Sequence, residues 1–365
     1  MKNILIMTND MNGGGAERVL LTLLQYLSRV QYRIDLCLVY RIGPLLSQIP
    51  NNVEVMALFK KRNIHSAEQI RKDDGELYQK AAKRRYDIEI AFLEGNAVKI
   101  MSKSTNSNAR KIAWVHIDLY QEHYTAPVYK SIEQERIAFS AFDQIFCVSS
   151  AVRDGLIKLL GPCLLPKTSV VFNPIDAEKV QYLAGEIEIP KESITFCAIG
   201  RLAPQKGFDR LLKAAGQIHA EGFQFQIWLL GEGRLIDVLQ NECVRLCLEE
   251  CVTFLGFQKN PYPYIKQADA LVVSSWTEGL SMVTGESLIL RTPVISTCCS
   301  GQAEALQHGK YGLLVENSER GIYAGMKAFL TGSYTGCELS ESGEERYLPY
   351  QLERYMKRIC ILLEK

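Results

Sequence analysis

Short apolar runs alternate with amphipathic stretches along most of the chain, and this alternation predicts its elements. Residues 16–29 carry apolar side chains at helical spacing, so they predict a helix that packs on a sheet. Strands that alternate with such helices are typical of βαβ units, in which the sheet is parallel. In the first half of the chain the apolar runs predict five strands, near residues 3–8, 34–40, 88–92, 111–115 and 145–148.

The pattern starts again after the segment VVFNPID at 170–176. A strand ends there, an Asn-Pro turn follows, and a loosely patterned polar stretch runs to Ser193. We therefore predict an α/β protein with two parallel-sheet domains, residues 1–172 and 173–347, and a final amphipathic helix at 348–365. Two such sheets that face one another would form a cleft, with ligands at the carboxyl ends of the strands. The second half predicts five further strands, at 194–200, 225–231, 252–257, 270–275 and 293–297.

The composition agrees with a two-domain protein of the cytoplasm. A chain of 365 residues is long for a single core. No stretch approaches the roughly 18 apolar residues that cross a bilayer, and the opening MKNILIMTND is too soon polar for a secretory signal. The eleven cysteines include no CxxC pair, so neither a disulfide framework nor a zinc ribbon is indicated. Cys243, Cys247 and Cys251 recur every four residues, and we interpret them as small side chains packed inward rather than metal ligands.

Charge is unevenly spread between the two halves. Residues 1–175 carry 23 Lys and Arg against 17 Asp and Glu, with basic clusters at 60–62, 71–72 and 83–85. Nucleic acid would require a stronger basic bias and interleaved aromatic residues, so we do not expect it as a partner. Two interpretations stay open for the clusters: a solvated helix face, or a surface that rests on anionic lipid.

A glycine-rich turn follows the first predicted strand. The sequence Gly13-Gly14-Gly15-Ala16-Glu17-Arg18 leads directly into a helix. Glycines let backbone N–H groups approach a phosphate or a sugar closely, and a helix N-terminus favours anionic groups. The spacing is neither G-x-G-x-x-G nor a Walker sequence, so it specifies neither NAD nor ATP. A structural turn and a ligand-contacting loop both remain open for Gly14 and Gly15.

A second candidate loop lies in IGRLAPQKGFDRLL at 199–212. Arg201 and Lys206 follow the end of a predicted strand and precede a helix. Two cations at a strand's carboxyl end suit a diphosphate, and a charge pair at 4 Å is worth about 4 kcal/mol at an effective dielectric near 20. Cations on a surface are more often merely solvated, but their position at the strand end favours a binding role.

The most specific segment is SSWTEGLSMVTGESLILRTPVIST at 274–297. Glu278 lies in a loop after a strand, and Glu286 lies eight positions later on the following helix. Apolar residues flank both, which indicates that at least one carboxylate is partly buried and needs a partner. A nucleotide sugar offers two groups that carboxylates can grip, the sugar hydroxyls and the ribose diol. The sequence therefore favours a nucleotide-sugar site at this strand end.

Taken in order, VFNPID, IGRLAPQKGFDRLL, LLGEG, VTFLGF and TEGLSMVTGESLILRTPVI resemble the retaining glycosyltransferases of family four. The N-terminal glycine loop followed by AER is also similar, so the resemblance spans nearly the whole chain. It resembles bacterial enzymes of polysaccharide, capsule or glycan assembly most. The resemblance implies the GT-B fold: two Rossmann-like domains, the first on the acceptor side and the second binding the donor, with the helix at 348–365 crossing back onto the first.

The resemblance also implies an activity and roles for individual residues. The activity is transfer of a sugar from a nucleoside-diphosphate sugar to a glycan or lipid-linked acceptor, with retained anomeric configuration and no metal ion or other cofactor. Glu278 would bind sugar hydroxyls, Glu286 the ribose diol, and Arg201 and Lys206 the diphosphate. His116, at the end of KIAWVH, would hydrogen-bond the reacting sugar. Backbone groups of five residues would assist: Gly279, Leu280, Ser281, Met282 and Val283.

Other functions stay open at this point. A nucleotide-sugar epimerase would need no acceptor, and a phosphorylase would need a further anion site or a cofactor lysine. A non-catalytic partner subunit of a glycan-assembly complex is disfavoured because Arg201, Lys206, Glu278 and Glu286 are all present. UDP is expected as the donor nucleotide only because it is the commonest in such enzymes. Glu94, at the end of the strand before that of His116, is a weaker candidate.

Overall fold

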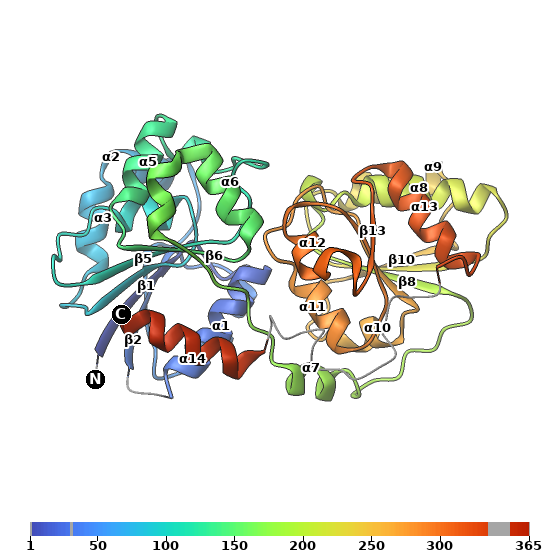
Figure 1. Cartoon of the computed structure of the whole chain (residues 1–365), viewed down its shortest axis with the longest axis horizontal. Coiled ribbons are helices and arrows are strands. Elements are labelled where there is room, and N and C mark those ends of the chain that lie inside the picture. Colours follow the sequence, from blue (N-terminus) through green and yellow to red (C-terminus); the bar gives the residue numbers. More distant parts are fainter. Residues whose placement is uncertain (1, 30–31, 335–350, 365) are drawn as a thin grey trace. The chain divides into compact units, whose positions relative to one another are not determined.

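The computed structural model describes residues 2–29, 32–334 and 351–364, and the chain folds into two compact units (Figure 1). Unit 1 consists of Met1–Pro174 with Glu353–Lys365, and unit 2 of Ile175–Leu352. Each unit is an α/β layer structure with its own parallel sheet, as the apolar pattern predicts. Among the described residues no helix is both long and apolar enough to cross a membrane.

The sheet of unit 1 has the strand order β3-β2-β1-β4-β5-β6-β7, with all neighbours parallel. All five strands predicted in this half are confirmed. Two strands were missed: β3, whose residues alternate little and are mostly half-buried at the sheet edge, and β7, which is only three residues long. The strands are β1 Lys2–Thr8, β2 Tyr32–Tyr40, β3 Glu54–Phe59, β4 Ile88–Ala91, β5 Arg110–Val115, β6 Gln144–Cys147 and β7 Thr168–Val170.

Helices cover both faces of this sheet. The predicted helix at 16–29 is α1, which buries its leucine-rich stripe, and the charged segment 60–86 forms α2 and α3. The helices of unit 1 are α1 Gly15–Leu27, α2 Ile64–Lys72, α3 Asp74–Ala81, α4 Asn96–Met101, α5 Ile132–Ser140, α6 Ser150–Leu160 and α14 Leu352–Glu364, with short 3-10 turns at Pro44–Gln48, Ala126–Val128 and Pro162–Lys167.

The C-terminal helix α14 belongs to unit 1, although the chain has passed through unit 2 before reaching it. It buries Tyr355, Met356, Ile359 and Leu363, and the Tyr32 hydroxyl donates to Glu364 Oε1 at 3.2 Å. The predicted start of this helix, at 348–350, lies outside the described residues. An amphipathic helix with one apolar stripe needs a partner surface, and unit 1 supplies it.

The sheet of unit 2 has the order β10-β9-β8-β11-β12-β13, again parallel throughout. All five predicted strands are present, and the three-residue edge strand β13 was missed. The strands are β8 Thr195–Ile199, β9 Gln226–Leu230, β10 Val252–Gly256, β11 Ala270–Val273, β12 Val294–Thr297 and β13 Leu313–Val315. The helices are α7 Ala177–Leu183, α8 Phe208–Ala220, α9 Ile236–Arg245, α10 Tyr262–Gln267, α11 Met282–Ile289, α12 Ser300–Ala305 and α13 Glu319–Leu330, with 3-10 turns at Pro204–Lys206 and Gln307–Gly309.

Each sheet has one point at which the chain reverses its winding direction. In unit 1 the first strand, β1, lies between β2 and β4, and in unit 2 the first strand, β8, lies between β9 and β11. Loops on the two sides of such a point diverge, which leaves room for a ligand outside the carboxyl ends of the strands. The loops after β1 and β4, and after β8 and β11, are therefore where the topology places candidate sites.

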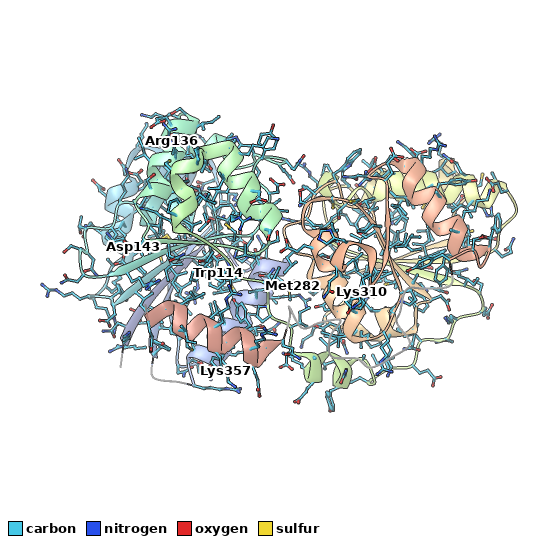
Figure 2. The ribbon with its side chains drawn as sticks, viewed as in Figure 1. Trp114, Arg136, Asp143, Met282, Lys310 and Lys357 are labelled. Atoms are coloured by element: carbon cyan, nitrogen blue, oxygen red, sulfur yellow. The ribbon has the colours of Figure 1, made fainter. Side chains whose placement is uncertain are left out.

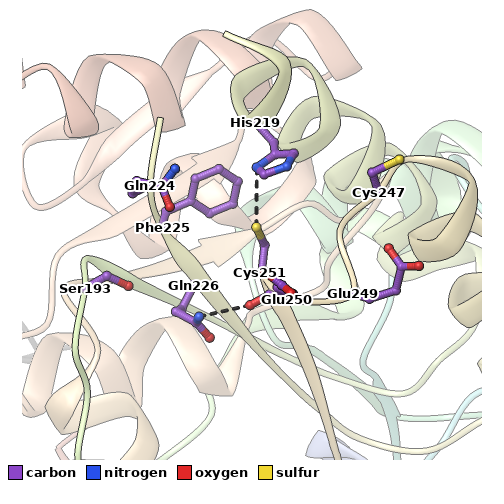
Figure 3. A pocket seen from close by; sticks show the side chains of 9 residues that line it. All are labelled: Ser193, His219, Gln224, Phe225, Gln226, Cys247, Glu249, Glu250 and Cys251. Carbon is purple, nitrogen blue, oxygen red and sulfur yellow. Dashed lines mark hydrogen bonds between the residues drawn. The ribbon is translucent and has the colours of Figure 1, made fainter. Parts of the chain in front are cut away.

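The cysteine prediction holds in part. Cys243 and Cys251 are buried, but Cys247 is exposed, so its inward packing was wrongly predicted. The helix α9 ends at Arg245, and Cys247 has a positive φ of 56° just beyond it, which breaks the four-residue periodicity. Cys251 and Cys247 line a cavity of about 410 Å³ beside the amino ends of β9 and β10 (Figure 3).

Candidate functional site

An ion pair forms where the winding of unit 2 reverses. Lys206, in the loop after β8, places its Nζ 2.6 Å from Oε1 of Glu278, in the loop after β11. The Ser275 hydroxyl donates to the same Oε1 at 2.6 Å. Glu278 is buried, with 8% of its surface exposed. The structure thus brings together a cation and a carboxylate that the sequence singled out separately, at the sheet edge where α/β proteins bind ligands.

Close backbone approach makes this arrangement possible. The Lys206 stem lies over Gly200, where a Cβ would come within 3.2 Å of its methylenes. Gly231, with φ of +137°, has no room for a side chain, because a Cβ there would lie 1.9 Å from the Gly200 carbonyl oxygen. The chain can therefore approach this closely at the ends of β8 and β9 only because both positions are glycine. The absence of a side chain on Gly200 leaves space for the Lys206 methylenes.

Arg201 differs from Lys206 in its surroundings. It is exposed, and its guanidinium makes no hydrogen bond or ion pair with any part of the chain that the structure describes. Lys206 is half-buried and already paired with Glu278. The two cations therefore differ: Arg201 offers an uncompensated charge, whereas Lys206 must share its charge between Glu278 and any incoming anion.

The loop from Gly279 to Ser281 leads into α11, which begins with Met282 and Val283; Met282 is labelled in Figure 2. Ser281 caps the helix, its Oγ accepting from the Thr284 N–H at 3.3 Å. The loop is held against the start of α12, since a Cβ on Gly301 would lie 1.8 Å from the Gly279 carbonyl oxygen. A helix N-terminus carries partial positive charge, so this end of α11 suits an anionic group.

Glu286 lies in the second turn of α11 and is buried, with 5% exposed. The hydroxyl of Tyr262, at the start of α10, donates to its Oε1 at 3.3 Å. Sequence reasoning missed Tyr262. The sequence feature that could have identified it is the Asn-Pro pair directly before it, because such a pair often precedes a helix and would place Tyr262 in the first turn.

Arg210 is a second residue that sequence reasoning missed. It is 2% exposed, and its guanidinium donates through Nε to the Ser274 carbonyl oxygen at 2.7 Å and packs 3.8 Å from the ring centre of Trp276. It thereby fixes the end of β11 just before Glu278. An arginine on an amphipathic helix ordinarily lies in solvent, so the pattern alone gave no indication of this contact.

In unit 1 the glycine loop forms the turn between β1 and α1. Gly13 has φ of +92°, Gly14 caps α1 and Gly15 begins it. The Glu17 carboxylate folds over Gly14, where a Cβ would lie 2.5 Å from its Oε2. A second anion at this helix end would meet the charge of Glu17, so the turn suits a neutral hydroxyl group better than a phosphate.

His116 directly follows β5, and its ring packs on Phe92 with 4.8 Å between ring centres. Burial lowers the pKa of His116 to about 3, although the nearby Phe92 carbonyl opposes the shift, so the imidazole is neutral. No hydrogen bond of ordinary geometry reaches either ring nitrogen within the described residues. A neutral imidazole in this state offers one donor and one acceptor.

Glu94, after β4, lies beside His116. Its Oε2 accepts the backbone N–H of His116 at 2.9 Å, and its Oε1 accepts the Tyr124 hydroxyl at 2.6 Å. Burial raises the pKa of the Glu94 carboxyl above its ordinary value, and these two hydrogen bonds oppose that shift. The structure thus brings Glu94 and His116 together at the carboxyl edge of the first sheet.

Two further features lie outside these sites. The cavity of Figure 3, lined by His219 and Cys251 whose Nδ1 and Sγ are 3.5 Å apart, borders the amino ends of the second sheet's strands. It is therefore at the opposite edge of that sheet from the Lys206–Glu278 pair.

Within residues 2–29, 32–334 and 351–364 no three His, Cys, Asp or Glu side chains gather in a group that could hold a metal ion.

Comparison with known families matches most of the chain. Residues 13–179 match the model of glycosyltransferase family 4, and residues 193–331 match that of the glycosyl transferases group 1. A glycosyltransferase of Methanocaldococcus jannaschii is 30% identical over 235 residues, which is 59% of this chain and 58% of the relative. These matches confirm the predicted resemblance to the glycosyltransferases of family four.

Two further relatives match a shorter stretch. The N-acetylgalactosamine-N,N'-diacetylbacillosaminyl-diphospho-undecaprenol 4-alpha-N-acetylgalactosaminyltransferase of Campylobacter jejuni is 33% identical over 166 residues, 45% of this chain and 44% of the relative. The lipopolysaccharide core biosynthesis glycosyltransferase LpsE of Rhizobium meliloti is 28% identical over 161 residues, 44% of this chain and 46% of the relative. The matched part thus spans about half the length of these curated relatives.

Solved structures with the same fold cover the whole chain. HepE of Anabaena, solved with UDP and glucose, has a TM-score of 0.80 at 19% identity over 100% of both chains. Sucrose-phosphate synthase of Thermosynechococcus elongatus has a TM-score of 0.84 at 16% identity, covering 100% of this chain and 98% of its own. The predicted fold class, two Rossmann-like parallel-sheet domains of the GT-B type, is confirmed.

Proposed function

We propose that this chain, which belongs to the group 1 and family 4 glycosyltransferases, transfers a sugar from a UDP-sugar to a glycan or lipid-linked acceptor, with retained anomeric configuration and no bound metal ion. The observation that carries this proposal is the Lys206–Glu278 pair beside the start of α11. It combines a cation, a buried carboxylate and a helix N-terminus at the carboxyl ends of two neighbouring strands, β8 and β11. A sugar diphosphate offers phosphates to the cation and the helix N-terminus, and hydroxyl groups to the carboxylate.

The diphosphate is assigned to Lys206, Arg201 and the first turn of α11. As the bond to the sugar breaks, negative charge develops on the leaving nucleotide, and fixed cations stabilise it most when they are already in place. Lys206 is held by Glu278 before the donor binds, so its ammonium does not need to be ordered during the reaction. Arg201 supplies the second charge.

The two carboxylates are assigned to the two diol-bearing parts of the donor. Glu278 accepts hydrogen bonds from the sugar hydroxyls, and Glu286 accepts them from the ribose, with Tyr262 fixing its orientation. The family resemblance assigns His116 to the reacting sugar, where a neutral imidazole can donate one hydrogen bond without adding positive charge. Gly14 and Gly15 are assigned to backbone contacts with the donor.

We infer the nucleotide of the donor and the class of acceptor from similar proteins. HepE of Anabaena was solved with UDP and with UDP-glucose, and TarM of Staphylococcus aureus with UDP. The Campylobacter jejuni relative is named for a diphospho-undecaprenol acceptor, and LpsE for lipopolysaccharide core biosynthesis. These names support a UDP-sugar donor and an acceptor in bacterial surface polysaccharide or glycan assembly.

An acceptor that is anchored in a lipid would bring the protein to a membrane surface. We propose a cytoplasmic protein that associates peripherally with anionic lipid at the inner face of the membrane. The exposed cluster Lys60-Lys61-Arg62 supports this, together with Ile64, which is 79% exposed beside it. Arg84 does not belong to this surface, because it is engaged by Asp35 at 2.8 Å and by Glu54 at 2.6 Å.

The test uses the purified chain with UDP-, GDP- and ADP-sugars. Binding to the native state raises the unfolding temperature by mass action, so the donor is the nucleotide sugar that gives the largest shift. Transfer is then measured with lipid-linked acceptors, with and without EDTA, and the product's anomeric configuration is read by NMR. Conversion of the donor without acceptor would indicate an epimerase, and binding without turnover would indicate a non-catalytic partner subunit.

A further inference from the structure

Three consecutive residues after β5 are tied to two buried carboxylates. His123 Nε2 lies 2.7 Å from Glu135 Oε2, and the Thr125 hydroxyl donates to Glu135 Oε1 at 2.6 Å. Between them, Tyr124 donates to Glu94 Oε1. Glu94 and Glu135 are 1% and 0% exposed. Both carboxylates therefore hold the same segment, but they make different further contacts.

Only Glu94 also reaches His116. Its second oxygen, Oε2, accepts the His116 backbone N–H at 2.9 Å, at the point where the chain leaves β5. The regular pairing of β5 ends at Val115, so the sheet ladder does not fix this peptide. The imidazole is then placed by the peptide that Glu94 holds and by two aromatic rings, Phe92 at 4.8 Å and Trp114 at 6.0 Å between ring centres.

Holding a loop with a buried carboxylate is unfavourable in desolvation free energy. Taking an ionised carboxylate out of water costs several kcal/mol unless hydrogen bonds offset it. For holding a peptide N–H alone, a smaller neutral acceptor would serve. Glu94 has two oxygens that point to two groups, so one side chain sets both the His116 peptide and the segment that follows it.

We propose that Glu94 is a positioning residue for His116. It fixes the His116 peptide so that the imidazole stays on Phe92, where neither ring nitrogen has a hydrogen-bond partner within the described residues. This rests on the role proposed above for His116. Glu94 is too deeply buried to touch a substrate, so it acts through geometry rather than by direct contact. A displacement of about 1 Å of a group near the reacting atoms is enough to slow catalysis about a hundredfold.

The test compares Glu94→Leu and Glu94→Gln with the matched variant Glu135→Leu. Glu94→Leu is expected to lower kcat at least tenfold with donor KM within about threefold of wild type. Glu94→Gln keeps an acceptor for the His116 N–H and is expected to restore kcat to within about threefold. Glu135→Leu removes an equally buried anchor of the same segment and is expected to leave kcat within threefold.

A second readout does not depend on activity. The chain has five histidines, so imidazole NMR signals of the donor-free protein can be assigned one by one. We expect Glu94→Leu to shift the His116 signals, and Glu135→Leu to shift those of His123 alone. Should the Leu variants not fold, Tyr124→Phe decides: it cuts the segment from Glu94 but keeps the His116 contact, so kcat and the His116 signals should stay as in wild type.

Three results would overturn the proposal. An equal loss of kcat in Glu135→Leu would mean that the segment merely needs both anchors. A loss in Glu94→Gln as large as in Glu94→Leu would mean that charge, not position, is required. A tenfold loss in Tyr124→Phe with unmoved His116 signals would mean that the segment itself carries the effect. Wild-type protein that transfers nothing from any UDP-sugar would instead count against the proposed function, and the NMR comparison would still decide the role of Glu94.

Discussion

The ammonium of Lys206 and the carboxylate of Glu278, 72 positions apart in the chain, meet at 2.6 Å where the winding of the second sheet reverses. Each group therefore defines the other's environment. Glu278 is 8% exposed, and Lys206 and Ser275 both donate to its Oε1. Lys206 is kept over the strand end by the same contact, and any account of donor binding must treat the two as one unit.

Substitution of Lys206 should affect both catalysis and stability. Lys206→Ala removes a charge-assisted contact of about 1.5–3 kcal/mol, so kcat/KM for the donor should fall by roughly one to two decades. It also leaves Glu278 with the Ser275 hydroxyl as its one side-chain partner within the described part of the chain, so the free energy of unfolding should fall by about 1–3 kcal/mol. Steady-state kinetics and urea unfolding measure the two effects.

Arg201→Ala is the matched control for that variant. Arg201 is exposed and unpaired within the described residues, so its removal should lower kcat/KM in the same direction but change the unfolding free energy by no more than about 0.5 kcal/mol. Unchanged kinetics in both variants, at saturating and at limiting donor, would refute the diphosphate assignment.

The two carboxylates should separate in their kinetic effects. Glu278 is assigned to the sugar, where positive charge develops in the transition state, so Glu278→Gln should mainly lower kcat. Glu286 is assigned to the ribose, remote from that charge, so Glu286→Gln should mainly raise donor KM and weaken binding of free UDP. Isothermal titration with UDP and steady-state kinetics on both variants measure this. Loss of UDP affinity in Glu278→Gln alone would exchange the two roles.

The depressed pKa of His116 predicts a specific loss of stability in acid. Below its ordinary pKa near 6.5, the unfolded chain binds a proton that folded His116 does not accept until about pH 3. The free energy of unfolding should therefore fall as the pH is lowered below about 6.5, by about 1.4 kcal/mol between pH 7.5 and pH 5.5. His116→Phe should lack this part of the dependence, as measured by urea unfolding at both values.

The titratable groups next to His116 have other effects on the pH dependence of the free energy of unfolding. Glu94, whose pKa is raised, binds its proton more readily in the folded state, so it adds stability on acidification and opposes the His116 effect. Tyr124 has a raised pKa and stays protonated throughout. Both remain in His116→Phe, so the difference between the two proteins isolates the histidine. An identical pH dependence for the two would mean that His116 titrates normally.

The basic cluster predicts binding to anionic vesicles that depends on salt. Each Lys or Arg near an anionic surface contributes about 1 kcal/mol, so Lys60→Ser with Lys61→Ser should weaken sedimentation with such vesicles at low salt by about thirtyfold. Lys259→Ser with Lys266→Ser, two exposed lysines of unit 2, should have little effect. Binding that ignores both lipid charge and salt would rule out this surface.

The sequence alone determined the architecture of both units. All ten predicted strands formed, because strands of a parallel sheet that is covered on both faces are buried on both sides and therefore carry short, nearly continuous apolar runs. The missed strands β3, β7 and β13 are edge strands, short or half-exposed, so their residues carry little of that signal. The positions of Arg201, Lys206, Glu278 and Glu286 at strand ends or on the following helix followed from the same pattern.

Only the tertiary structure decided which of these side chains meet. The contacts of Lys206 with Glu278, of Tyr262 with Glu286 and of Glu94 with His116 join loops or helices that are 22 to 72 positions apart. No local periodicity encodes such pairs, because they depend on strand order and on glycines that let loops approach. Burial followed the same rule: the depressed pKa of His116 and the desolvation of Glu94 arise from packing around the strand ends, which the fold as a whole determines.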